Sequence, residues 1–256
     1  MRNRGKHSIK KAKNKNGVII IIRFIFIICI IVSAIYILKW NKENAQTKQI
    51  STKIEKTVTV IEENNKGKEE YNIDFVALKE INPDVVAWIK VKNTNIEYPI
   101  VKTTNNEYYL NHSLDKTINS AGWPFMDYKE ELNGKDKNIV IYGHNRKDKS
   151  MFGTLSDTLK KEWYENKDNL EIIYITEEGV QTYQVFSNYQ IPNEDYYIKT
   201  NFKGDEFNKF IQTIKDRSIY NYGIEANENV QVLTLSTCAN NNKYRVVLHA
   251  IRKEKI

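Results

Sequence analysis

The sequence predicts a mainly β fold, a closed barrel or sandwich of short strands, with one apolar helix in front of it. Short runs rich in β-branched and aromatic residues recur between turn signals, and few segments show helical periodicity. Many short strands with few helices favour a barrel or sandwich over a parallel α/β sheet. The apolar run over residues 18–38 adds the helix.

The apolar run at 18–38 is as long as a membrane-spanning helix, which needs about 20 such residues. A cleaved signal peptide is the alternative, but no small-residue cleavage site follows the run. Residues 1–17 are basic and contain no acid, so the positive-inside rule predicts a cytoplasmic N-terminus. We therefore expect a cytoplasmic tail at 1–17, an anchor at 18–38, a polar stalk at 39–68 and an extracellular domain at 69–256.

The net charge of +7 comes from the N-terminal segment. Residues 1–40 hold nine of the 39 basic residues and no acid, which leaves 30 basic against 32 acidic residues in the remainder. The exported part therefore has no basic excess for nucleic-acid binding. The sequence also lacks a nucleotide-binding glycine pattern and any pair of metal ligands at regular spacing, so we expect no cofactor and no metal.

Individual elements follow from periodicity and turn residues. Apolar positions at helical spacing predict a helix that ends before Pro83, and similar patterns predict helices at 151–164 and 205–216. The expected strands are short apolar runs bounded by polar or turn residues. They are expected at 85–91, 96–101, 138–144, 170–176, 180–191, 229–237 and 243–252.

A possible nucleophile and base lie at two predicted strand ends. Cys238 is the only cysteine outside the apolar run, and His144 ends the strand "NIVIYGH". A Cys/His pair brought together by folding is typical of thiol acyl transfer, in which a thiolate attacks a carbonyl and imidazole moves protons. Arg245 begins the next strand, where a tight loop would place it beside Cys238. Its guanidinium suits an oxyanion or a substrate carbonyl.

Together these motifs resemble the class B sortases, membrane-anchored cysteine transpeptidases of Gram-positive bacteria. The resemblance covers roughly residues 70–253 and depends on "TLSTC" with an upstream "YGHN", supported by "FMDY", "SMFGTL" and "YRVVLHA". It implies a sortase β-barrel of about eight strands with N-terminal helices and an inserted helix. It implies that Cys238 is the nucleophile, His144 the acid/base and Arg245 the stabiliser. Ser236 and Asn106 match residues that bind the substrate.

The resemblance also implies the reaction. Class B sortases cleave an NP-x-T-x-like sorting motif after threonine, hold the product as a thioester and transfer it to a peptidoglycan amine. The expected partners are therefore secreted proteins with that motif, a cell-wall amine and the membrane. One alternative is an anchored cysteine peptidase or peptidoglycan hydrolase, although papain-like enzymes place the cysteine before the histidine. The other is a non-catalytic cell-wall binding protein with a buried thiol.

Overall fold

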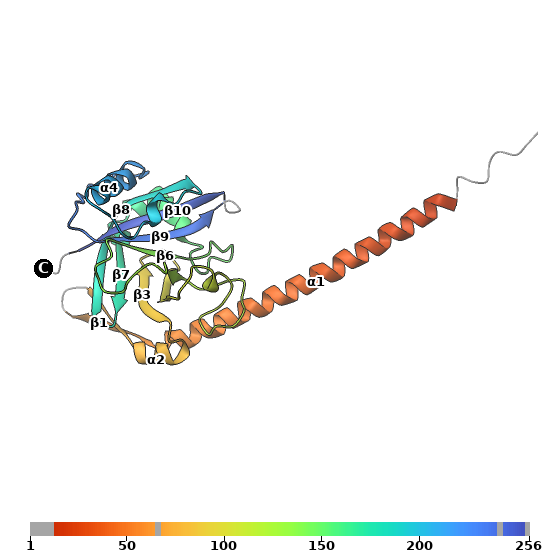
Figure 1. Ribbon diagram of the computed structural model, residues 1–256. Coiled ribbons are helices and arrows are strands. Elements are labelled where there is room, and N and C mark those ends of the chain that lie inside the picture. Colours follow the sequence, from red (N-terminus) through yellow and green to blue (C-terminus); the bar gives the residue numbers. More distant parts are fainter. Residues whose placement is uncertain (1–12, 65–67, 240–242, 254–256) are drawn as a thin grey trace, which may run out of the picture. The chain divides into compact units, whose positions relative to one another are not determined.

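The computed structural model describes residues 13–64, 68–239 and 243–253. The chain divides into two compact units, Met1–Gln46 and Thr47–Ile256. All strands of the described residues lie in the second unit, which Figure 1 shows as a barrel with a helix, α4, beside β8. The mainly β fold predicted from the sequence is confirmed.

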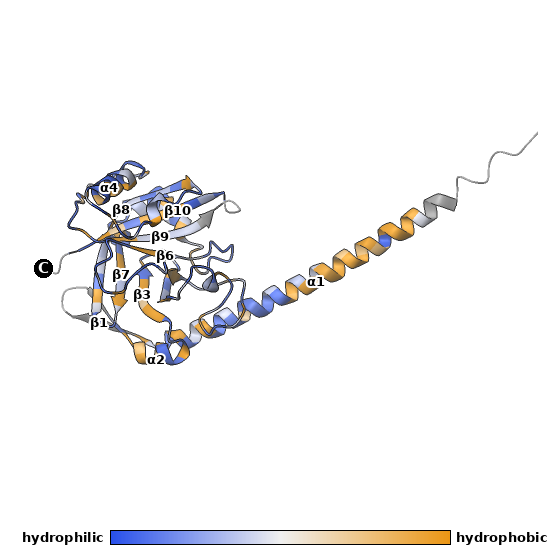
Figure 2. Ribbon diagram, in the orientation of Figure 1, coloured by the Kyte–Doolittle hydropathy of each residue, from blue (hydrophilic) through white to orange (hydrophobic). Residues whose placement is uncertain are grey.

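From residue 13 on, the first unit is formed by the greater part of α1 (Lys13–Glu55). From Gly17 on, this helix is long and apolar enough to cross a membrane. The large apolar side chains between Val18 and Leu38 are exposed to solvent, and Figure 2 shows them as an orange run along the helix. Exposed apolar surface on this scale is stable in lipid rather than in water. The predicted apolar helix is present, and its orientation stays a prediction.

Eight strands close the barrel in the order β10-β8-β7-β3-β4-β5-β6-β9. Neighbours β4 and β5, and β6 and β9, are parallel, and the other six pairs in the described barrel are antiparallel. The strands are β3 (Val85–Val91), β4 (Glu97–Val101), β5 (Phe125–Met126), β6 (Asn138–Tyr142), β7 (Glu171–Thr176), β8 (Gly179–Pro192), β9 (Val232–Ala239) and β10 (Tyr244–Arg252).

The barrel core follows the two-residue period of its strands. Ala87, Ile89 and Val91 alternate along β3 and are fully buried, and they share one core cluster with Leu233 and Leu235 of β9. Side chains at i and i+2 lie on one face of a strand, so this alternation directs them into the interior. The strands themselves were predicted from the sequence as short apolar runs.

The segment between the apolar helix and the barrel is more ordered than the polar sequence of 39–68 predicts. Helix α1 continues to Glu55, and the hairpin of β1 (Val58–Asn64) and β2 (Lys68–Ile73) follows. Buried contacts explain the difference, because Ile50 and Ile54 pack in a cluster with Phe75 of α2. The boundary of the stalk stays a prediction.

Two short helices begin and end as their sequences predict. In α2 (Phe75–Ile81), the Asp74 carboxylate accepts a hydrogen bond from the Ala77 amide at 2.9 Å, which caps the helix. Asn82 is extended, as expected for a residue that precedes proline. The inserted helix α4 (Glu206–Asp216) has the predicted apolar face, which packs against residues of β8 and β10. The face consists of Phe207, Phe210, Ile211 and Ile214.

The single helix predicted at 151–164 is wrong. The chain instead forms a 3-10 turn (Leu155–Leu159) and a short helix, α3 (Lys161–Glu165), separated by an extended Lys160. Leu155 and Trp163 are both buried in the barrel core cluster. The break lets both side chains enter the core, so tertiary packing overrides the local helical pattern.

A buried acid lies in the connection between β5 and β6. Glu130 is only 3% exposed, and its carboxyl oxygen accepts a hydrogen bond from the Val140 amide at 2.9 Å. Burial raises the pKa of Glu130 to about 9, and the nearby Asp136 and Asp127 act in the same direction. Glu130 is therefore a neutral acid in the folded protein at pH 7.

Glu130→Gln is expected to stabilise the protein increasingly as the pH rises. The unfolded chain loses this proton near pH 4.5 and the folded chain near 9, so the native carboxyl costs stability as pH rises between them. Glutamine keeps an acceptor for the Val140 amide and has no proton to lose. Between pH 5 and 8, the advantage of the variant in the free energy of unfolding should grow by on the order of 3 kcal/mol.

Chemical denaturation of both proteins across that pH range measures this difference. Glu131→Gln is the matched control, because Glu131 is the next residue in the chain and is exposed. Parallel stability curves for the parent and Glu130→Gln would contradict a buried neutral acid.

Candidate active site

Two sequence-distant strands bring His144 and Cys238 to the same end of the barrel. β6 and β9 are parallel neighbours, with Tyr142 paired to Ser236. Beyond that pair, the Gly143 amide donates to the Ser236 carbonyl at 3.2 Å, and the Thr237 hydroxyl donates to the Gly143 carbonyl at 2.6 Å. Gly143 directly precedes His144, and Ser236 and Thr237 are the two residues before Cys238. The backbones at residues 144 and 238 therefore lie side by side at this end of the strand pair.

Arg245 joins the same rim from the next strand. β10 is antiparallel to β9, and its Arg245 is the direct register partner of Cys238. The guanidinium of Arg245 is partly exposed and donates to the Tyr244 carbonyl at 3.2 Å. The side chain of Cys238 and the loop residues 240–242 lie outside the described part of the chain. The backbone thus places all three predicted catalytic positions at one barrel end.

The imidazole of His144 is held by a backbone carbonyl. His144 is half-buried, and its Nε2 lies 2.7 Å from the carbonyl oxygen of Leu110, at the end of a 3-10 turn (Tyr108–Leu110). Gly122 also lies close to the ring: a Cβ at this position would lie 2.9 Å from His144 Cδ2. Its φ of +60° is also a conformation that side chains disfavour. The sequence analysis identified neither contact.

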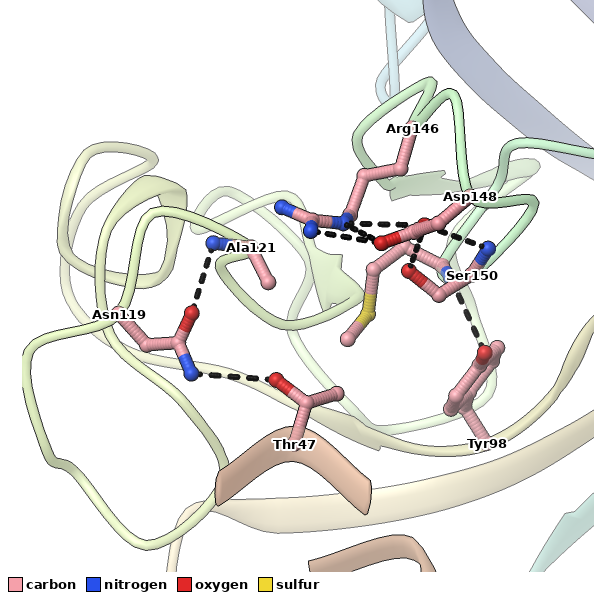
Figure 3. A network of polar contacts seen from close by, with 8 residues as sticks. Thr47, Tyr98, Asn119, Ala121, Arg146, Asp148 and Ser150 are labelled. Carbon is pink, nitrogen blue, oxygen red and sulfur yellow. Dashed lines mark hydrogen bonds and ion pairs between the residues drawn. The ribbon is translucent and has the colours of Figure 1, made fainter. Parts of the chain in front are cut away.

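The loop that follows His144 is closed by the carboxylate of Asp148, which Figure 3 shows between Arg146 and Ser150. Asp148 accepts hydrogen bonds from Arg146 Nη2 at 2.7 Å and from the Ser150 hydroxyl at 2.6 Å. Partial burial acts to raise the pKa of Asp148, but these hydrogen bonds outweigh it and hold the pKa at about 2. The loop then returns to its start, because the Phe152 amide donates to the His144 carbonyl at 3.0 Å.

This carboxylate was missed by the sequence analysis. An aspartate two residues before a serine is a common turn pattern, and in "RKDKS" it was the available signal. The loop is also fixed from the barrel side, where the Tyr98 hydroxyl accepts from the Met151 amide at 3.0 Å (Figure 3). Together these hydrogen bonds hold the loop that follows His144 and so support the backbone of His144.

The two predicted substrate-binding residues lie close to the rim but are engaged in the protein. Ser236 is buried, and its hydroxyl lies 3.0 Å from the hydroxyl of Tyr197. Asn106 donates to the Asp127 carboxylate at 2.9 Å and accepts from the Tyr128 amide at 2.9 Å. Contact with a substrate stays a prediction for both residues.

The same Asp127 oxygen accepts from the Tyr142 hydroxyl at 2.7 Å, two residues before His144. Through this shared carboxylate, Asn106 is connected to the end of β6.

His249 is a structural histidine inside the barrel wall. It is fully buried, and burial lowers its pKa to about 3, so the ring is neutral. Nδ1 lies 2.9 Å from the Thr234 hydroxyl, and Nε2 lies 2.9 Å from the Tyr189 hydroxyl. With both nitrogens occupied and no access to solvent, this ring has no free position for a substrate proton.

The comparisons with known proteins agree with this geometry. The Sortase domain family matches residues 89–253. Sortase B of Staphylococcus aureus is 30% identical over 219 residues, covering 85% of this chain and 88% of the relative. Sortase B of Listeria monocytogenes is 34% identical over 140 residues, covering 54% of this chain and 55% of the relative.

Solved sortase B structures superpose along most of the second unit. Sortase B of Bacillus anthracis, in complex with AAEK2, has a TM-score of 0.71 at 30% identity and covers 85% of this chain and 98% of its own. Sortase B of Clostridium perfringens has a TM-score of 0.66 at 33% identity and covers 71% and 100%. With the His, Cys and Arg positions meeting at one end of an eight-stranded barrel, the chain belongs to the sortase family and, within it, to the class B sortases.

Proposed function

We propose that Cys238 is the nucleophile with which this sortase transpeptidase cleaves an NP-x-T-x-like sorting motif after its threonine. The observation that carries the proposal is the backbone register at the rim. The pairing of β9 with β10 sets Cys238 opposite Arg245, and the β6–β9 pairing leads His144 out beside them. Acyl transfer through a thioester requires a nucleophile, a base and a group that stabilises the oxyanion, and these positions provide all three.

The reaction proceeds in two balanced steps. The Cys238 thiol transfers its proton to His144 and attacks the threonine carbonyl carbon, which forms a tetrahedral intermediate. The intermediate collapses as the C–N bond breaks, the imidazolium protonates the leaving amine, and a thioester remains. A peptidoglycan amine then attacks the thioester and loses a proton through His144, so that a new amide forms and the thiol is restored.

Arg245 supports the charge that develops in both steps. The substrate carbonyl oxygen becomes an oxyanion in each tetrahedral intermediate, and a donor poised at that point stabilises the transition state. Guanidinium stays charged at any physiological pH and presents several donors in one plane. We assign Ser236 and Asn106 to the walls that receive the sorting peptide.

The proposed location follows from the charge distribution. We place the basic tail 1–17 in the cytoplasm and the apolar run 18–38 in the membrane. The barrel then lies outside the membrane, where secreted proteins with a sorting motif and the peptidoglycan amine are both found. A single anchor of this orientation keeps the enzyme at the surface across which its substrates are exported.

The test uses the detergent-solubilised full chain with a fluorogenic NP-x-T-x-like peptide and triglycine. One solved sortase B was crystallised in complex with triglycine, which makes this peptide a suitable first acceptor. Intact-mass measurement should detect an adduct of the peptide up to its threonine, and triglycine should convert it to a ligated product. A panel with the motif scrambled is the control. Cleavage without an adduct would contradict the thioester route, and binding without cleavage would favour the non-catalytic alternative.

A further inference from the structure

We propose that the Leu110 backbone carbonyl fixes the tautomer of His144, so that Nδ1 is the ring nitrogen that exchanges protons with Cys238 and the leaving amine. The proposal deepens the function above and rests on the catalytic role given there to His144. It makes Tyr109, Leu110 and Gly122, which precede the histidine by more than twenty residues, part of the positioning apparatus of the site.

The assignment follows from what a carbonyl can do. His144 Nε2 lies 2.7 Å from the Leu110 oxygen, well within hydrogen-bond distance. A carbonyl oxygen accepts and never donates, so Nε2 carries a hydrogen in both the neutral and the charged ring. Nδ1 has no hydrogen-bond partner within the described part of the chain. The neutral ring is therefore an Nε2–H tautomer with a bare Nδ1, and this bare nitrogen is the base.

His249 provides an internal contrast, because its partners impose the opposite tautomer. Asn138 donates its amide hydrogens to two backbone carbonyls, so its oxygen accepts from the Thr234 hydroxyl at 2.6 Å. With that hydrogen used, the Thr234 oxygen accepts from His249 Nδ1–H, and Nε2 accepts from Tyr189. The neutral forms of the two rings are thus opposite tautomers: His249 has both nitrogens bonded inside the protein, and His144 has a bare Nδ1.

The Leu110 carbonyl is itself held in place by the residue before it. The Tyr109 side chain is 1% exposed, and its hydroxyl donates to Asp84 at 2.7 Å and accepts from Asn82 at 2.6 Å. Its backbone carbonyl accepts from the Trp123 amide at 2.9 Å. Tyr109 therefore anchors the 3-10 turn at both its side chain and its backbone, and the turn presents the next carbonyl to His144.

Gly122 limits the space beside the contact between the ring and Leu110. A Cβ there would lie 2.5 Å from the Tyr109 carbonyl oxygen, 2.9 Å from His144 Cδ2 and 3.0 Å from the Leu110 carbonyl oxygen. The turn that contains Gly122 is tied down by Asn119, whose carboxamide accepts from the Ala121 amide and donates to Thr47 (Figure 3). The ring therefore keeps its contact with Leu110 because glycine leaves space for it on this side.

The tautomer defines the route of the proton. The Cys238 proton moves to Nδ1 as the sulfur attacks, and the imidazolium then has a hydrogen on each nitrogen. Nε2–H keeps its bond to Leu110, so the ring does not turn, and Nδ1 passes the same proton to the leaving amine. A base oriented in this way by a third group is the general requirement of nucleophile–base pairs.

The direct experiment records nitrogen spectra of the full chain labelled with 15N-histidine in detergent. His144→Gln identifies the His144 signals by their loss. In the neutral ring of His144, a protonated Nε2 and a bare Nδ1 are expected, with the opposite pattern at His249. A dominant Nδ1–H tautomer at His144, or an even mixture of both, would overturn the proposal. Because these spectra need no substrate, they are independent of whether sorting peptides are cleaved.

Two variant pairs test the positioning residues. Tyr109→Phe removes the anchoring hydroxyl, and it is expected to lower kcat about tenfold at nearly constant KM and to raise the share of the Nδ1–H tautomer. Tyr108→Phe is its matched control, because the anchoring hydrogen bonds described above use the hydroxyl of Tyr109 and not that of Tyr108. Equal kcat and equal spectra in both variants would remove Tyr109 from the positioning apparatus.

Gly122→Ala is expected to displace the ring from Leu110 and lower kcat by at least about tenfold. Its control is Gly134→Ala, where φ is +71° but nothing lies within 4 Å of the new Cβ. Equal activity in the two alanine variants would contradict the steric role. If His144 shows the expected tautomer while Cys238→Ala still cleaves, the proposed function fails and the tautomer assignment stands. If Cys238→Ala is inactive but His144 shows the other tautomer, only the tautomer assignment is refuted.

Discussion

Cys238→Ala is expected to abolish cleavage of a sorting peptide, transfer to triglycine and the covalent adduct together. The reason is that each step passes through the sulfur: without it no thioester forms, and neither His144 nor Arg245 can supply a nucleophile. The fold should remain, because the pairing of β9 with β6 and β10 is made by backbone groups that alanine retains. Peptide turnover, intact mass and thermal unfolding measured on the same preparation test this prediction.

The matched control is Cys29→Ala, which removes the cysteine of the apolar helix. It should keep full turnover and form the adduct, so any loss in Cys238→Ala is specific to the rim. Sustained cleavage by Cys238→Ala would remove the thiol from the mechanism and favour a different nucleophile.

Arg245→Ala is expected to lower kcat/KM by two to three decades, which corresponds to about 3–4 kcal/mol of lost transition-state stabilisation. The loss should fall mainly on kcat, because the oxyanion exists only in the transition state and the intermediates. Arg245→Lys should recover only part of the rate, since an ammonium keeps the charge but lacks the planar fork of donors. Steady-state kinetics with the same peptide separate the two parameters.

Arg252→Ala is the control for this variant, because Arg252 is an exposed arginine at the opposite end of the same strand, β10. It should turn over like the parent. Equal losses in Arg245→Ala and Arg252→Ala would indicate a general electrostatic effect, and no loss in either would exclude Arg245 from the reaction.

Much of the fold is legible in the sequence because its signals are local. The short apolar run at 85–91 predicts a strand, and the apolar face of 205–216 predicts the inserted helix. The pattern at 151–164 misled, because Leu155 and Trp163 have helical spacing but enter the core from two separate segments. Before residue 73, the polar sequence indicated at most partial helix within 45–63, and the β1–β2 hairpin was not predicted.

The candidate site divides in a similar way. Cys238, His144 and Arg245 were named as candidates from residue type and strand position, because the chemistry of a reactive side chain can be read from its residue type. Asp148 and Tyr109 were missed, because a turn carboxylate and a buried tyrosine are common and have no distinctive pattern. The Leu110 carbonyl has no sequence signal at all, as every residue carries the same backbone oxygen.

What the amino-acid order decided, then, is the set of reactive groups, the apolar helix and the alternation that builds a barrel. Folding alone decided that 144 and 238 would be neighbours, through the parallel β6–β9 pairing. Folding also brings the Leu110 oxygen to 2.7 Å from His144 Nε2. The physical reason is that side-chain chemistry and periodicity are properties of short segments. Strand register and a backbone acceptor's position, in contrast, depend on contacts between segments that are distant in the chain.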